Sequence, residues 1–334
     1  MILIYGRIDD PPLAGAIEAL QEAGAPYVLL EQTALDREGL RIEVGQKGVD
    51  GVLVAAGEVI ALERFHSIYA RPLELQPPVF DPAGASRARL LHEQLFEWLD
   101  VANALVVNRP RAMQSNASKP LQAQLIGAAG FEVPETLVTS NPEEVRAFWQ
   151  EHGRVVYKSA SGVRSIVQEF QERDVARLAR LAALPVQFQA YVPGVDVRVH
   201  VVGRRAFAAT IDSPVIDYRY AAREGAMATL ERTDLPRSVA ARCVALARQM
   251  DLPLAGIDLR RRPDGQYICF EVNPMPAYTY FEAHTGLPIG RALAQLLISG
   301  EGKESAGLHR GAGSRKSYRN SREGHLAATS SQAR

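Results

Sequence analysis

The chain has 334 residues, a formal net charge of +0 and 47% hydrophobic residues. This length predicts two or three domains or subdomains, and the apolar fraction is ample for a sizeable core. The balanced charge gives no reason to expect nucleic acid or a membrane surface as the main partner. The two cysteines lack metal-ligand spacing, and no apolar stretch approaches the roughly 18 residues of a membrane span. We therefore expect a cytoplasmic protein in a reducing compartment.

The N-terminal third alternates strand and helix patterns. A strand over 1–6, a helix over 11–24 and a strand over 26–31 have the spacing of a βαβ unit with a parallel sheet. Further strand-like runs precede a helix over 86–104. These elements predict an N-terminal Rossmann-like α/β domain over 1–108. The inner side of the long helix is expected to carry Leu90, Leu91, Leu95, Trp98 and Leu99.

Two further units and a tail complete the chain. A helix–strand–helix–strand pattern, with Asn141 as the N-cap of its second helix, begins a central subdomain that we place at 109–190. Several strands, a hairpin and a final helix predict a C-terminal subdomain at 191–299. The last stretch, 300–334, is rich in Gly, Ser and charge and has almost no large apolar residues, so we expect a disordered, solvated tail.

The dipeptide Asp264-Gly265 is a strong signal for a two-residue hairpin turn, because that turn needs positive φ angles. Such a turn places Asp258 opposite Glu271, and the period of two puts Asn273 on the same face. A bulge or a longer turn would shift this register by one residue and break the pairing. The same register pairs Arg262 with Tyr267 and Arg260 with Cys269, and it turns Ile257, Leu259, Phe270 and Val272 toward the core.

Two carboxylates and an amide oxygen therefore share one patch of this hairpin. Like charges directly opposite each other destabilise a sheet, and a hard cation removes that repulsion. Oxygen ligands of this kind suit Mg²⁺ that bridges phosphates, with Mn²⁺ as a substitute ion. The alternative is a surface hairpin with two unrelated acids. We favour the metal because the opposite face of the same strands is apolar.

The segment FEVNPMPAYTYFEAHTG, at 270–286, resembles the ATP-grasp superfamily, as do AGIDLR and YVPGVDVRVHVVG upstream of it. The resemblance is strongest to carboxylate–amine ligases related to the ribosomal-protein glutamate ligase and to the graspetide (microviridin-type) macrocyclases. It covers roughly 108–298 and implies a two-subdomain ATP-grasp fold of α+β type after the N-terminal α/β domain. It also implies ATP and Mg²⁺ as cofactors.

The resemblance implies a role for each matching position. Lys119 and Lys158 match lysines that reach the nucleotide phosphates. Arg198 matches the arginine that steadies the transferred phosphate and the acyl phosphate, and Arg219 is a further candidate for that anion. Gln189, Tyr191 and Val192 match the hinge whose backbone holds adenine, Asp196 lies where relatives meet ribose or orient a lysine, and Asp258, Glu271 and Asn273 match the magnesium ligands.

Each of these side chains also has an ordinary alternative. The two lysines alone could be solvated surface groups, and Arg198 could be the exposed face of a half-buried strand. We expect His200 and His284 to be structural. The family's glycine-rich loop is replaced here by SASGVRS, which puts its phosphate-covering role in doubt unless Ser159, Ser161 and Arg164 compensate.

The predicted function is ligation at a carboxylate. Phosphorylation by ATP turns a carboxylate into an acyl phosphate, which an amine or hydroxyl can attack, and phosphoryl transfer asks chiefly for positioning and charge neutralisation. The expected substrate is a small-molecule, peptide or protein carboxylate, with specificity in the N-terminal unit and in 216–235. The alternatives are a phosphotransferase acting on a small molecule and a non-catalytic nucleotide-binding module. A homodimer is the default expectation for the oligomeric state.

Overall fold

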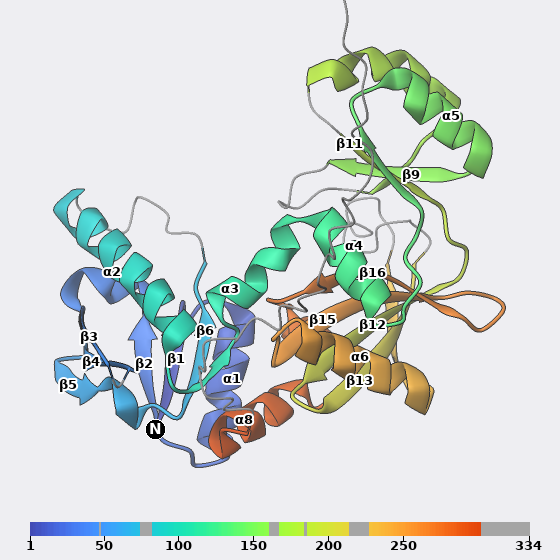
Figure 1. Cartoon of the computed structure of the whole chain (residues 1–334). Helices are drawn as coiled ribbons and strands as arrows, with labels where there is room; N and C mark the ends of the chain where they lie inside the picture. Colours follow the sequence, from blue (N-terminus) through green and yellow to red (C-terminus); the bar gives the residue numbers. More distant parts are fainter. Residues whose placement is uncertain (47, 74–81, 160–166, 184–185, 214–226, 302–334) are drawn as a thin grey trace, which may run out of the picture.

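The computed structural model describes residues 1–46, 48–73, 82–159, 167–183, 186–213 and 227–301, and these form four β-sheets with helices on their faces (Figure 1). The predicted tail falls almost wholly outside the described residues, as do Arg219 and most of the SASGVRS loop. No helix among the described residues is long and apolar enough to cross a membrane.

The N-terminal sheet has the strand order β2-β1-β6-β7, and all its neighbours run parallel. Helix α1 joins β1 to β2, so the predicted βαβ unit is confirmed. Every residue of β1 and of β6 is buried, as expected for a parallel sheet covered on both faces. The bounds are β1 Ile2–Gly6, α1 Pro11–Glu22, β2 Tyr27–Glu31, β6 Ser67–Arg71, α2 Pro82–Val101 and β7 Leu105–Val107.

A three-stranded antiparallel sheet, β3-β4-β5, extends this N-terminal part. Helix α2 packs its buried side chains into the same core, and Leu91, Leu95, Trp98 and Leu99 lie there as predicted. The prediction for Leu90 was wrong, because this side chain is 56% exposed. Successive residues of an α-helix are rotated by about 100°, so Leu90 points away from the core that Leu91 enters. The bounds are η1 Gln32–Arg37, β3 Gly39–Gly45, β4 Gly48–Ala55, β5 Glu58–Ala61 and η2 Leu62–Arg64.

The central sheet is antiparallel and has the order β10-β9-β11-β8. Helix α5 covers it, and the side chain of Asn141 accepts a hydrogen bond from the Glu143 N–H at 3.0 Å, which confirms the predicted N-cap. The stretch after β10 is a 3₁₀-helix, η5. The bounds are α3 Pro110–Met113, η4 Gln114–Ala117, α4 Lys119–Ala128, β8 Thr136–Thr139, α5 Pro142–His152, β9 Val155–Ser159, β10 Gln168–Glu169, η5 Glu172–Ala183 and β11 Val186–Ala190.

The C-terminal sheet is antiparallel and five-stranded, with the order β14-β13-β12-β15-β16. Helix α6 covers the face that carries Val197, Val199 and Ile257. The opposite face carries Arg198 and Asp258 and is partly covered by α7 and α8. The bounds are β12 Val195–Val202, β13 Arg205–Asp212, β14 Thr229–Thr233, α6 Arg237–Gln249, β15 Leu254–Arg261, β16 Tyr267–Asn273, α7 Tyr278–Thr285 and α8 Ile289–Ser299.

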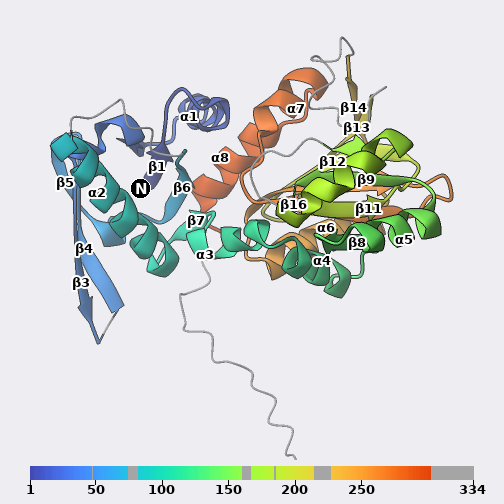
Figure 2. The ribbon, with the colours of Figure 1, turned by 90° about the horizontal axis from the view of Figure 1, so that it is seen from above.

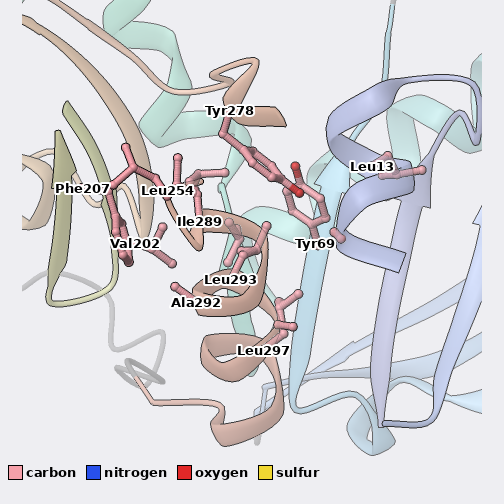
Figure 3. Packing of buried hydrophobic residues seen from close by; sticks show 14 of the residues in the cluster. Leu13, Tyr69, Val202, Phe207, Leu254, Tyr278, Ile289, Ala292, Leu293 and Leu297 are labelled. Atoms are coloured by element: carbon pink, nitrogen blue, oxygen red, sulfur yellow. The ribbon is translucent and has the colours of Figure 1, made fainter. Parts of the chain in front are cut away.

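One hydrophobic cluster joins the N-terminal sheet to the C-terminal sheet. Helix α8 lies between them, and Leu293 and Leu297 point from it into the shared core (Figure 3). Tyr278 of α7 reaches across to α1, where its hydroxyl donates to the Pro12 carbonyl at 2.6 Å. Figure 2 shows the two sheets on opposite sides of α8, seen from above. The C-terminal sheet is therefore fixed relative to the N-terminal part by buried packing.

Candidate active site

The hairpin of β15 and β16 brings the two predicted metal-binding carboxylates together. Asp258 pairs with Glu271, and Gly256 with Asn273, as predicted. The route to this register differs from the prediction. Arg262 N–H donates to the Gln266 carbonyl at 2.8 Å, so the turn contains three residues rather than two.

The longer turn shifts the tip of the hairpin by one residue. Arg260 therefore pairs with Ile268 rather than with Cys269, and that part of the prediction was wrong, as was the pairing of Arg262 with Tyr267, which lies opposite Arg261. A β-bulge between Asp258 and Leu259 then restores the register, because Phe270 is an extra residue on β16. The two offsets cancel at the carboxylates. Ile257, Leu259, Val272 and Cys269 face the core, whereas Phe270, predicted to be there, is only partly buried.

Three cations surround the two carboxylates. Lys119, at the first turn of α4, lies with its Nζ 3.1 Å from Oε1 of Glu271. Lys158, at the end of β9, lies with its Nζ 3.5 Å from Oε2 of the same carboxylate. Arg198 Nη1 donates to Asp258 Oδ1 at 2.5 Å across the β12–β15 pair. The fold thus gathers side chains from four separate strands and one helix.

The electrostatics of Glu271 follow from these contacts. Burial by itself raises the pKa of a carboxyl group, because the charged form loses its hydration. The positive charges of Lys158, Lys119 and Arg198 outweigh burial here and hold the pKa of Glu271 below its ordinary value. Glu271 is therefore ionised at neutral pH and able to ligate a cation.

Glycine is required opposite Asn273 because Arg198 lies over it. A Cβ on Gly256 would overlap the Arg198 guanidinium and would lie 2.8 Å from the Cβ of Pro276. Arg198 is only 6% exposed, and its guanidinium also lies 5.7 Å from the ring centroid of Phe281 in α7. Its position is thus set from three sides, and its head group is held at the carboxylates.

The segment after Asn273 is tied to the N-terminal part of the chain. The Asn273 side-chain oxygen accepts a hydrogen bond from the Met275 N–H at 2.8 Å, which leaves one lone pair for a cation. Buried Asn108 donates to the Pro274 carbonyl at 2.5 Å. Arg71, paired with Asp10, donates to the Pro276 carbonyl at 3.2 Å. Patterns in the sequence gave no sign of these roles for Asn108 and Arg71, because each acts through a backbone carbonyl far along the chain.

The predicted adenine hinge lies between the central and C-terminal sheets. The Tyr191 N–H donates to the Arg154 carbonyl at 2.9 Å, and the guanidinium of Arg154 lies 3.7 Å from the Tyr191 ring centroid.

Asp196, predicted near ribose, forms a bidentate pair with Arg260 at 2.7 and 2.9 Å. Arg260 also donates to the Val192 carbonyl at 2.8 Å. Sequence analysis assigned Arg260 no role. The Gln189 side chain donates to Thr136 at 3.0 Å, at the start of the hinge.

A large cleft opens beside the hinge. It has a volume of about 1090 Å³, and its walls come from β10 and η5 of the central part and from β12, β13 and β14 of the C-terminal sheet. Its lining is mostly charged and polar. Of the hinge side chains described above, Arg154, Tyr191, Asp196 and Arg260 line the cleft.

The donor set fits a magnesium ion shared with phosphates. Among the described residues, no group of three His, Cys, Asp or Glu side chains could hold a metal on its own. Two carboxylates and an amide oxygen leave coordination positions that Mg²⁺ commonly fills with substrate phosphates and water. The lysines and Arg198 supply the positive charge that a polyphosphate needs. This arrangement is of the kind that suits ATP-dependent phosphoryl transfer.

Comparisons with known proteins agree with that class. A family model described as the RimK-like ATP-grasp domain matches residues 116–297. The probable alpha-L-glutamate ligase of Xanthomonas oryzae pv. oryzae is 28% identical over 192 residues, which are 52% of this chain and 62% of that protein. The ATP-grasp ligase PsnB, complexed with a phosphomimetic variant of its minimal precursor, Mg and ADP, is 28% identical with a TM-score of 0.74, over 90% of this chain and 98% of PsnB.

The macrocyclase MdnC from Microcystis aeruginosa MRC, bound with precursor peptide MdnA, shares the fold. Its TM-score is 0.71 at 21% identity, over 89% of this chain and 99% of MdnC. The family model covers more than half of this chain, which therefore belongs to the RimK-like ATP-grasp family of carboxylate–amine ligases. The chain spans about 62% of the length of the Xanthomonas oryzae relative that it matches.

Proposed function

We propose that this protein is an ATP- and Mg²⁺-dependent ligase that joins a carboxylate of a peptide to an amine or hydroxyl group. The observation that carries the proposal is the convergence of Lys119, Lys158 and Arg198 on the carboxylates of Asp258 and Glu271. A site with three cations and two anions suits a polyphosphate substrate. The other proposed contacts are to adenine, from the hinge backbone at 189–192.

Each residue of the site has a proposed role in one or both steps of the reaction. Lys119 and Lys158 bind phosphate oxygens of ATP, and Asp258, Glu271 and Asn273 would hold Mg²⁺, which would neutralise negative charge on the phosphates. The γ-phosphoryl group passes to the substrate carboxylate, which gives an acyl phosphate and ADP. The incoming amine or hydroxyl then forms the new bond to the carbonyl carbon, and inorganic phosphate leaves with the broken C–O bond. The proton of the nucleophile leaves with the phosphate. Arg198 steadies the anionic groups in both steps.

Two observations favour a peptide as the substrate. PsnB, of which this chain covers 98%, is seen with a precursor peptide. The cleft beside the hinge, of about 1090 Å³, slightly exceeds the ~300–1,000 Å³ that small-molecule sites occupy. Its charged lining can pair with peptide backbone and polar side chains. The free, buried Cys243 and Cys269 agree with a cytoplasmic location, which we also propose.

The test is to incubate the pure protein with ATP, Mg²⁺ and peptides that carry Asp or Glu together with Lys, Ser or Thr. We expect ADP, free phosphate and a product peptide lighter by one water per bond. The Glu271→Gln variant is the matched control and should release no ADP. Release of ADP without free phosphate would instead identify a phosphotransferase. Nucleotide binding without turnover in either form would identify a non-catalytic module.

A further inference from the structure

The proposed metal ligands lie on an edge strand. β16 is the last strand of the C-terminal sheet, and on the side that faces away from β15 the described residues offer only an isolated bridge, between Glu132 and Ile268, and no further strand. A buried strand edge needs partners for its N–H and C=O groups. At Cys269 the partner is the Glu132 carbonyl, which accepts the Cys269 N–H at 2.9 Å. At Val272, between the two ligands Glu271 and Asn273, the partner is a side chain.

That side chain is Gln122 of helix α4. Its Oε1 accepts the Val272 N–H at 3.1 Å, and its Nε2 donates to the Val272 carbonyl at 2.8 Å. The side-chain amide thus forms the two hydrogen bonds that a residue of a neighbouring strand would form. Gln122 is 1% exposed and Val272 is fully buried, so water cannot replace either bond.

The same helix face carries a phosphate-binding candidate. Lys119 precedes Gln122 by three residues, a spacing that places both side chains on one side of α4. Gln122 forms hydrogen bonds to the backbone of Val272 in β16. Lys119 forms an ion pair with Glu271, the residue before Val272. The register between α4 and β16 therefore sets the distance between a lysine and a metal ligand.

We propose that Gln122 is a positioning residue for the metal site: its side-chain amide replaces the missing sixth strand and fixes the backbone that carries Glu271 and Asn273. The proposal rests on the proposed role of these two residues as metal ligands. Without both bonds, the peptide groups on either side of Val272 can rotate. The two ligands would then no longer point together toward one cation.

The test compares two glutamines of one helix. Gln122→Met removes both hydrogen bonds at almost constant volume, and Gln124→Met makes the same change at an exposed position of α4. The readouts are the affinity for ADP without metal and the affinity for Mn²⁺ at saturating ADP, followed by the electron paramagnetic resonance of free Mn²⁺. We expect Gln122→Met to weaken Mn²⁺ binding at least tenfold and to change metal-free ADP binding less than threefold. Gln124→Met should change neither.

Equal losses of metal-free ADP binding and of Mn²⁺ binding would overturn the proposal, because a general loosening of the fold would explain them. Unchanged Mn²⁺ affinity would overturn it as well. If Gln122→Met does not fold, Gln122→Asn keeps the amide but is one methylene too short to reach both groups, and the same tenfold criterion applies. Hydrogen exchange of the Val272 amide should accelerate in either variant. Ligase turnover is not a readout, so a wild-type protein that binds Mn²⁺ and ADP without ligating would refute only the proposed function.

Discussion

Lys119 and Glu271 form an ion pair between α4 and β16, with 3.1 Å between Nζ and Oε1. Lys158 forms an ion pair with the other oxygen of the same carboxylate, and Arg198 forms an ion pair with Asp258. Without nucleotide, every charged ligand of the proposed metal site already has a cation beside it. The site carries a net charge of about +1 from these five groups, which repels a free divalent ion and attracts a polyphosphate.

We therefore expect Mn²⁺ to bind weakly until ADP or ATP is present. Replacing both Lys119 and Lys158 by Met should raise the affinity for Mn²⁺ without nucleotide by roughly tenfold or more, because two opposing charges within about 4 Å are removed. The same double variant should lose nucleotide affinity. Titration of Mn²⁺ with and without ADP checks both effects. Tight Mn²⁺ binding to the nucleotide-free wild type would contradict this order of binding.

The close approach of Arg198 to Gly256 predicts a severe effect of one methyl group. Gly256→Ala should displace the guanidinium from Asp258 and lower kcat by roughly 10²-fold, the loss typical of one transition-state donor. Gly127→Ala is the control, since a Cβ there meets nothing within 4 Å and an exposed helical alanine stabilises by about 1 kcal/mol. Steady-state kinetics and thermal melts distinguish the two variants. An active Gly256→Ala enzyme would show that Arg198 need not lie where the structure has it.

Arg260 connects the hinge to the C-terminal sheet. Arg260→Met breaks the bidentate pair with Asp196 and the bond to the Val192 carbonyl, so the hinge backbone should lose its fixed position. We expect the KM for ATP to rise roughly tenfold and the melting temperature to fall, because the partly buried carboxylate of Asp196 loses its bidentate partner. Arg261→Met, on the next residue and exposed, is the matched control. Equal KM values for both variants would exclude this role for Arg260.

His200 predicts a pH dependence of stability. Its ring is fully buried against Phe281, at 4.9 Å between centroids, and neither ring nitrogen has a hydrogen-bond partner among the described residues. Burial, with help from the Arg198 charge, lowers the pKa of His200 well below its ordinary 6.5. As pH falls below about 6.5, the unfolded chain takes up this proton first, so the folded state loses stability. The contribution is complete above that pH.

His200→Leu should remove this dependence. The variant is expected to be at least as stable as wild type at pH 8, since a buried polar group without partners costs about 1–3 kcal/mol. Between pH 6.5 and about 5, the melting temperature of the variant should fall less steeply than that of the wild type. In this range a proton that only the unfolded chain binds lowers the stability of the wild type by up to about 1.4 kcal/mol per pH unit. Burial also lowers the pKa of His92, so a smaller slope of the same sign should remain. An unchanged slope would mean that His200 titrates normally.

Local sequence patterns predicted many of the elements of the fold. Hydrophobic periodicity located the parallel sheet and the long helix, and capping chemistry located α5. Hydrophobic periodicity did not predict correctly whether Leu90, at the edge of the apolar face of α2, is buried or exposed. It also gave no sign of α7 or β14, whose faces are defined by contacts with distant parts of the chain.

The pairing of Asp258 with Glu271 is correct for a reason that the sequence does not contain. Asp264-Gly265 is read as a two-residue turn, and Pro263 makes it three, with Gly265 in the left-handed region at φ 84°. The bulge at Phe270 compensates for that extra residue. Nothing in a period-two pattern reveals such a pair of insertions. The sequence does not predict the roles of Gln122, Asn108 and Arg260. Their hydrogen-bond partners are backbone groups or side chains that come near only in the folded chain.

The packing of α8 between the N-terminal and C-terminal sheets determines which parts of the site share a core. Buried side chains of both sheets form that core, and Glu271, Asp258 and Arg198 lie on the C-terminal sheet. The central sheet has a separate core, formed by residues between 137 and 188, and meets the rest through the hinge. Lys119, on α4, packs with the strand that carries the proposed metal ligands, whereas Lys158 lies on the central sheet. The single carboxylate of Glu271 thus forms an ion pair with one lysine from each of these two parts.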